Sequence, residues 1–153
     1  MHTRSLTATF IAFSLLIACT GKDSQDEATL KEAGEIHLQA ATIQESLESR
    51  MDSLAALKSQ LTLLKTPGAS AAAFAIDSVT KRFEDWEENL VEVPGLAHKH
   101  DNAEGEKHHH HDHKPAPDVT ASEMLDIQNE LKTNIGQISA DAKTALKNGR
   151  RAL

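Results

Sequence analysis

The chain has 153 residues, with 16 Lys and Arg against 23 Asp and Glu, so its formal charge is −7 with neutral histidine. This length allows one small domain with tails, and four Phe, one Trp and no Tyr leave few bulky side chains for a thick core. Ala, Leu, Glu, Lys and Gln dominate, which favours an all-α fold. The acidic balance excludes nucleic acid as the main partner, because phosphate contacts need clustered Lys and Arg. A single Cys cannot form an internal disulfide.

Residues 1–18 are typical of an export signal. A weakly basic start with Arg4 precedes the largely apolar run from Leu6 to Ala18, which is too short to span a bilayer comfortably. The end of this run, Leu16-Ile17-Ala18-Cys19, resembles the bacterial lipobox. The resemblance implies cleavage before Cys19 and attachment of acyl chains, such as palmitate, to Cys19. An ordinary signal peptide with an incidental Cys is the alternative.

Cleavage before Cys19 leaves 135 residues, which begin with the lipidated Cys and a polar tether at 19–26. Several acyl chains on one Cys anchor a protein stably in a bilayer, whereas a single chain is marginal. No Asp follows Cys19 directly, so the common signal for retention in the inner membrane is missing. We therefore expect a lipid-anchored protein of the cell envelope, in the outer membrane, facing either the periplasm or the medium. The acidic tether resembles the surface-export signals of Bacteroidota lipoproteins.

A helical hairpin is predicted over residues 27–91. The first helix runs from about Glu27 to Lys65 and ends at Thr66-Pro67-Gly68. The second runs from about Ser70 to Leu90, and the short connection makes the two antiparallel. In both helices, apolar residues recur at alternating steps of four and three, as in a bundle or coiled coil. The apolar positions are Ile36, Ala40, Ile43, Leu47, Leu54, Leu57, Leu61 and Leu64, then Ala72, Ile76, Val79, Phe83, Trp86 and Leu90.

Arg50 is the only interruption of the first apolar face. It either pairs with an acid across the bundle or extends its head group to solvent. Phe83 and Trp86 lie at core spacing in the second helix, which favours packing over a ligand platform.

A linker at 92–119 and a third helix at 120–149 complete a predicted three-helix bundle, with a tail at 150–153. The linker holds three Pro and two Gly and lacks apolar periodicity, so it is functional or disordered. Thr120 and Glu123 form a capping box at the start of the third helix, and Asn148-Gly149 is a plausible end. The linker is long enough for this helix to run in either direction. Its predicted face is Met124, Ile127, Leu131, Ile135, Ile138, Ala142 and Ala145.

Seven of the nine histidines fall between residues 98 and 113, inside the linker. Neutral imidazole is the commonest ligand of transition metals. Alternate residues of an extended run point the same way, so nearby imidazoles can chelate one ion together. Glu104 and Glu106 can ligate or orient an imidazole. The predicted metal ligands are His98, His100, Asp101, His108, His109, His110, His111, Asp112 and His113.

A flexible ligand set imposes little geometry, so we expect modest selectivity among Zn(II), Ni(II), Cu(II) and Co(II). No cofactor is expected to be required. Binding needs neutral imidazole and should fail as the pH falls through about 6.5. The segment has three other interpretations: a solvated low-complexity tract with no selected role, a pH-responsive linker, or an expression tag.

Other polar residues carry weaker signals. His37 lies beside the first apolar face and is expected at its flank or on the surface. Glu84, Asp85, Glu87 and Glu88 are expected to form a solvated acidic face. We find no catalytic triad, no His-Glu-x-x-His helix and no phosphate loop, so the protein is expected not to be an enzyme.

Several stretches together resemble a family. Phe83-Glu84-Asp85-Trp86-Glu87-Glu88-Asn89-Leu90, Val93-Pro94-Gly95, the His-rich segment, and Pro117-Asp118-Val119-Thr120 leading to Met124-Leu125-Asp126-Ile127-Gln128 are similar to small Bacteroidota lipoproteins labelled "viral A-type inclusion protein". That label reflects coiled-coil similarity and implies no viral role. The resemblance implies a lipidated helical protein, without an assigned activity or site residues to carry over.

Two functions are expected from these features. In the first, the lipid-anchored protein binds or buffers divalent transition metal through the His-rich segment. In the second, an apolar face of the helices is an interaction surface for a helical partner or a second copy, and the His-rich segment is only a spacer. The second function is motivated by the length of the first helix, because this helix extends past the second helix and leaves part of its apolar face unpaired.

Overall fold

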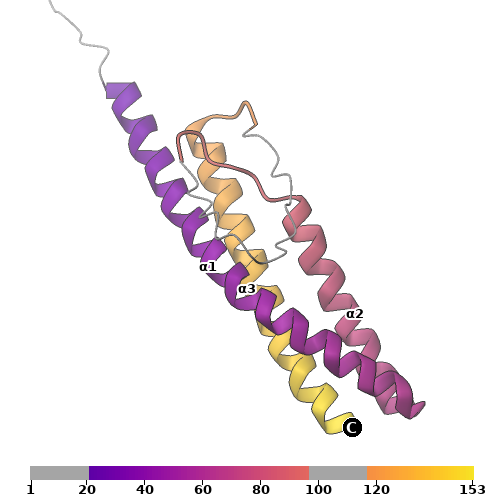
Figure 1. Cartoon of the computed structure of the whole chain (residues 1–153). Coiled ribbons are helices and arrows are strands. Elements are labelled where there is room, and N and C mark those ends of the chain that lie inside the picture. The colour runs from indigo at the N-terminus through magenta and orange to yellow at the C-terminus, as the bar shows by residue number, and fades with distance from the viewer. Residues whose placement is uncertain (1–20, 97–116) are drawn as a thin grey trace, which may run out of the picture.

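The computed structural model describes residues 21–96 and 117–153, excepting the side chains of 21–23. Three helices make up the fold: α1 (Gly21–Leu64), α2 (Pro67–Glu88) and α3 (Ala121–Ala152). The described residues contain no strand. Figure 1 shows the three helices packed side by side, with α1 extending beyond both partners at its N-terminal end. The predicted all-α three-helix bundle is confirmed.

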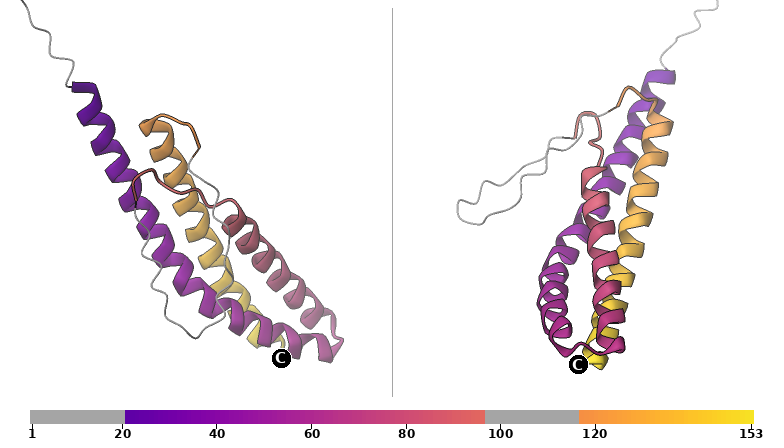
Figure 2. Two further views of the ribbon diagram at one scale, coloured as in Figure 1. Left: turned by 45° about the horizontal axis from the view of Figure 1, so that its top comes forward. Right: turned by 90° about the vertical axis from the view of Figure 1, so that its right-hand side faces the viewer.

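The direction of α3, which sequence left open, is parallel to α1. Contacts between the two helices advance together along both chains, from Ala33 beside Met124, through Arg50 hydrogen-bonded to Ser139, to Leu57 beside Gly149. Helix α2 runs antiparallel to both, as Figure 2 shows. Helices α1 and α3 therefore begin at the end of the bundle where α2 finishes.

The bundle has a proximal end and a distal end. The proximal end comprises residues 24–38, 88–96 and 117–130, and it holds the starts of α1 and α3. The distal end comprises residues 58–74 and 143–153, and it holds the α1–α2 connection and the C-terminus (Figure 1).

The core is built from the predicted faces of all three helices. Leu47, Leu54 and Leu61 of α1 are fully buried, and they pack with Ile76 of α2 and Ile135 of α3. Phe83 and Trp86 are buried as predicted, and the Trp86 indole N–H donates to the carbonyl of Leu131 (2.9 Å). Burying such apolar area contributes roughly 25 cal/mol per Å².

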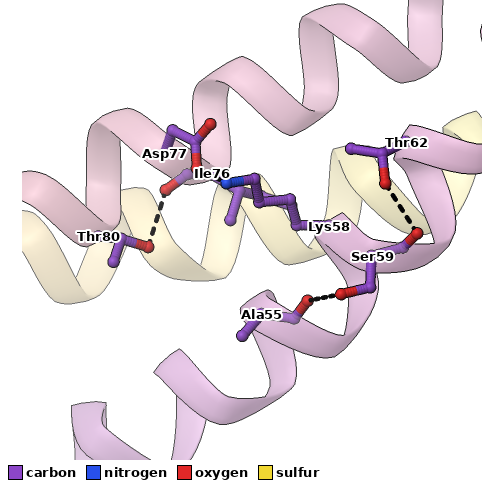
Figure 3. Close-up of polar contacts among 7 residues, drawn as sticks. All are labelled: Ala55, Lys58, Ser59, Thr62, Ile76, Asp77 and Thr80. Atoms are coloured by element: carbon purple, nitrogen blue, oxygen red, sulfur yellow. Dashed lines mark hydrogen bonds and ion pairs between the residues drawn. The ribbon is translucent and has the colours of Figure 1, made fainter.

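The connection between α1 and α2 is only two residues long. Lys65 adopts a left-handed conformation (φ 51°), and Thr66 caps α2 by accepting a hydrogen bond from the Ala69 amide (3.1 Å). Pro67, expected to end α1, is instead the first residue of α2, where its missing N–H costs nothing. Farther along, Lys58 of α1 forms an ion pair with Asp77 of α2 (Figure 3).

Two helix ends differ from the prediction. Helix α1 begins at Gly21, so most of the expected tether continues the helix, and the acidic Asp26 and Glu27 lie near its positive N-terminal end. Helix α3 continues through the expected cap at Asn148-Gly149 to Ala152. Gly149 is buried against Leu57 and Leu61, so its role is close approach of α3 to α1.

Arg50 satisfies neither expected arrangement fully. Its guanidinium is half-buried and donates to the Ser139 hydroxyl (2.9 Å) across the bundle, and Met51 beside it packs against the core. Arg50, which interrupts the apolar face of α1, is thus hydrogen-bonded to a neutral side chain of α3. Leu64, predicted in the core, is partly exposed because the chain turns immediately after it.

The two glycines of α3 allow a matched test of packing. A Cβ at Gly149 would lie 2.6 Å from Leu57 Cδ2, whereas a Cβ at Gly136 would meet nothing within 4 Å. Gly136→Ala should raise the free energy of unfolding by about 1 kcal/mol through helix propensity. Gly149→Ala should lower it, because overpacking costs about 1–3 kcal/mol. Urea denaturation of both variants measures the difference, and an equal gain from both would contradict the packing of Gly149.

The capping box of α3 predicts a pH dependence. The Glu123 carboxylate accepts hydrogen bonds from the Thr120 hydroxyl (2.7 Å) and amide (2.8 Å), and these bonds lower the pKa of Glu123 below its ordinary value of 4.5. A lowered pKa in the folded state stabilises the protein above the ordinary value, and this contribution is lost as the pH falls through the folded-state pKa. Glu123→Gln should therefore be less stable than the native chain at pH 7, with the difference disappearing in acid. Thermal denaturation from neutral pH down to about pH 3 measures this, and a constant difference would contradict it.

Candidate functional site

The residues predicted to carry chemistry lie outside the described residues. Cys19 precedes them, and the predicted ligands His98, His100, Asp101, His108, His109, His110, His111, Asp112 and His113 fall within the gap at 97–116. Within residues 24–96 and 117–153, no group of three or more His, Cys, Asp or Glu side chains is placed to hold a metal ion. The predicted ligands therefore stay predictions. What the structure describes is the scaffold that carries both ends of the segment.

Both flanks of the His-rich segment lie at the proximal end. On one side, Val93 is buried with Ala33 of α1 and Met124 of α3, and Leu96 packs against this cluster. Gly34 lets Leu96 lie directly on α1, because a Cβ there would be only 3.3 Å from Leu96 Cδ1. On the other side, residues 117–120 lead into the first turn of α3 (Figure 1). The bundle thus holds both flanks beside the first turns of α3.

A chain of buried polar groups holds the segment that follows α2. Gln128 of α3 donates through Nε2 to the carbonyl of Val91 (2.9 Å). Its Oε1 atom then faces His37 Nδ1 of α1 at 3.0 Å. Because an amide oxygen only accepts, Nδ1 must carry the proton. His37 is 2% exposed and Gln128 is 0% exposed, so these bonds join α1, α3 and the approach to the His-rich segment within the core.

The expectation that His37 lies on a flank or on the surface is wrong. His37 directly follows the core residue Ile36 and lies one turn before Ala40. It would be a flank residue if α1 packed only on α2. Helix α3 and residues 91–96 cover it, because α1 continues past the end of α2. The sequence signal that could have indicated this burial is a His on α1 and a Gln on α3, each next to a predicted core position.

Glu87 also departs from the prediction. It was expected in a solvated acidic face, but it is buried, and its carboxylate accepts a hydrogen bond from Gln44 Nε2 of α1 (3.0 Å). Glu84, Asp85 and Glu88 are exposed as expected. The Gln44–Glu87 bond fastens the last turn of α2 to α1, two helical turns from His37. A second hydrogen bond between side chains therefore fixes the end of α2, from which the chain leads toward the His-rich segment.

A groove of about 630 Å³ adjoins the same flank. Its apolar lining comes from Leu30, Gly34 and Leu38 of α1 and from Val93–Leu96. The charged residues Asp26, Glu27, Lys31 and Glu35 complete its lining. Gly95 adopts a left-handed conformation (φ 79°) that turns the chain along this wall. The groove can accommodate an apolar group and offers few ligands for a cation.

Charge is distributed unevenly along the bundle. The residues of the proximal end include ten Asp and Glu and one Lys, whereas those of the distal end include six Lys and Arg and no Asp or Glu. The acidic end is the one that holds both flanks of the His-rich segment. A surface of one sign raises the local concentration of counter-ions, so divalent cations are attracted toward this end.

No protein family matches the chain, and no curated protein or solved structure is similar to it. The resemblance to small Bacteroidota lipoproteins therefore stays a prediction from the quoted stretches.

Gln128→Leu tests the buried polar chain. The substitution keeps a side chain of similar length but leaves the His37 Nδ1–H and the Val91 carbonyl without their amide partner. Each buried polar group that loses its partner costs about 1–3 kcal/mol, so the free energy of unfolding should fall by roughly 2–4 kcal/mol. Urea denaturation measures this loss, and hydrogen exchange should report faster exchange at residues 91–96.

The matched control is Gln137→Leu, which changes an exposed Gln of the same helix and should stay within about 0.5 kcal/mol of the native chain. Equal stability of the two variants would show that the buried chain contributes nothing.

Proposed function

We propose that the protein is a lipid-anchored component of the cell envelope that binds or buffers divalent transition metal ions through residues 98–113. The observation that carries the proposal is the density of donors: seven imidazoles and four carboxylates occur in sixteen consecutive positions. Zinc, nickel, cobalt and copper(II) all accept imidazole nitrogen. The protein's role in this proposal is binding, not catalysis.

The arrangement of the scaffold supports this role. The apolar faces of the three helices are buried against one another within the described residues. The flanks of the segment lie at the acidic proximal end, which attracts cations before any ligand binds them. The buried bonds of Gln128 and Gln44 fix the chain that leads into the segment. The bundle would thus present a ligand-rich segment from a rigid and negatively charged base.

The proposed anchor is close in sequence to the start of α1. Cys19 precedes the first residue of α1 by two positions, and Leu96 lies on α1 at Gly34, about 20 Å farther along the helix at the standard rise. No helix in the described part of the chain is long and apolar enough to cross a membrane. With acyl chains on Cys19, the proposed metal-binding segment would begin close to the membrane surface.

The alternative is an interaction protein that binds a partner through an apolar helix face. Helix α1 gives this alternative no specific support. The part of α1 that outreaches α2 does carry apolar residues, such as Ala33 and Ile36, but α3 and residues 91–96 cover them. Residues 24–28, which extend farther, are polar apart from Ala28. The apolar part of α1 that suggested a helical partner is therefore already buried within the chain.

Calorimetric titration with Zn(II) tests the proposal. Residues 19–153 carrying Cys19→Ser should bind zinc at pH 7.5. At pH 5.5, a site with two imidazoles should weaken by roughly 100-fold, because each imidazole with a pKa near 6.5 is then about nine-tenths protonated. Replacing the seven histidines between 98 and 113 with Asn should abolish binding while leaving helix content unchanged.

A matched variant with Asp101→Asn and Asp112→Asn keeps every imidazole and should lose much less affinity. Equal heats from the native chain and the seven-Asn variant would reject the proposed metal role.

A further inference from the structure

The distal end of the bundle is basic and exposes apolar side chains. Leu63 of α1 is 79% exposed, Phe74 of α2 is 77% exposed, and Leu153 at the end of α3 is 55% exposed. The same end carries the cations Lys65, Lys143, Lys147, Arg150 and Arg151, all of them exposed. We propose that this end binds the surface of an anionic lipid bilayer. The inference goes beyond metal binding and does not depend on it.

The cations of this end are available to an external anion. Within residues 24–96 and 117–153, these five residues form no ion pair, whereas Lys58 is neutralised by Asp77 (Figure 3). Lys143, Lys147, Arg150 and Arg151 recur at steps of four, three and one, so they share the outward face of α3, opposite the buried Ala142, Ala145 and Gly149. Basic residues close to an anionic membrane surface each strengthen binding to it.

Helix capping explains only part of this charge. Cations in the last turn of a helix compensate its negative end, and Arg150 and Arg151 lie in the last turn of α3. The effect falls off within one turn, so Lys143 and Lys147 lie outside it. Their charges also have no acidic neighbour in the residues that define the distal end. The basic face is therefore larger than the stability of α3 requires.

The distribution of the apolar residues favours a planar surface over a helical partner. A partner helix is recognised by a continuous stripe of apolar residues at steps of three and four. Here the exposed Leu63, Phe74 and Leu153 come from three different segments around one end of the bundle. An end that exposes both Phe and Leu and Lys and Arg matches the interface of a bilayer, where apolar side chains insert and cations meet anionic head groups.

Vesicle co-sedimentation tests the proposal. Residues 19–153 with Cys19→Ser carry no acyl chain but keep every described residue. They should bind vesicles with about one third phosphatidylglycerol, and not vesicles of phosphatidylcholine alone. Binding should fall steeply as the salt concentration is raised to about 0.5 M, because salt screens exposed charges.

Two sets of variants identify the surface. Lys143→Gln, Lys147→Gln, Arg150→Gln and Arg151→Gln together should lower the partition coefficient by roughly 100-fold or more. The control changes four cations elsewhere, Lys31→Gln, Lys81→Gln, Arg82→Gln and Lys132→Gln, and thus removes the same net charge. Leu63→Ser with Phe74→Ser should weaken binding by about 10-fold, whereas Leu38→Ser at the proximal end should not. Circular dichroism checks that each variant folds.

The outcomes separate clearly. Selective loss of binding in the distal variants would support the proposal. Equal binding by the distal and control variants, or no binding to the anionic vesicles, would overturn it. Binding to polyglutamate without binding to vesicles would also overturn it, and would assign the surface to an acidic polypeptide. The zinc titration is independent, so failure of either proposal leaves the other standing.

Discussion

The parallel packing of α3 along α1 is the contact on which the rest of the structure depends. Helix α1 has 44 residues and α2 has 22, so a hairpin of the two would leave half of the apolar face of α1 in water. Helix α3, with 32 residues, covers α1 from Ala33 to Leu57 and beyond. Since a helix in a folded protein gains most of its stability from burying such a face, α1 depends on α3 for its order.

This packing also determines which residues become buried near the start of α3. At the proximal end α2 has already finished, and residues 91–96 take its place against α1 and α3. An irregular segment brings carbonyl groups into the core, and these need donors. Gln128 supplies one for Val91, and His37 completes the amide's hydrogen bonding from α1. The polar residues of this region are thus a consequence of replacing a helix by an irregular segment.

Sequence periodicity predicted the parts of the fold that depend on local pattern. The apolar faces, the hairpin, Phe83 and Trp86 in the core and the Thr120–Glu123 capping box all follow from spacing within one helix, and the structure confirms them. His37, Glu87 and Gly149 were misplaced because each is buried by a different helix or segment. The pattern within one helix does not show such contacts, and for His37 and Gly149 the direction of α3 was also open. The proposed ligands required no packing information, since their signal is local density.

Parallel packing has an electrostatic consequence that connects the two ends. Both α1 and α3 start toward the proximal end, where α1 extends farther, and both finish at the distal end (Figure 1), so their dipoles point the same way. Glu123 in the first turn of α3 and Arg150 and Arg151 in its last turn compensate that helix, whereas the last turn of α1 contains no basic residue. The other charges of each end remain for external ligands.

Along α1, the two ends are separated by the 20 positions from Leu38 to Lys58, or about 30 Å at the standard rise, whereas charges in physiological salt are screened within about 10 Å. The acidic end and the basic end therefore act on their surroundings independently. One rod can then attract cations at the end that adjoins its proposed anchor and present a basic surface at the other, without either charge cancelling the other.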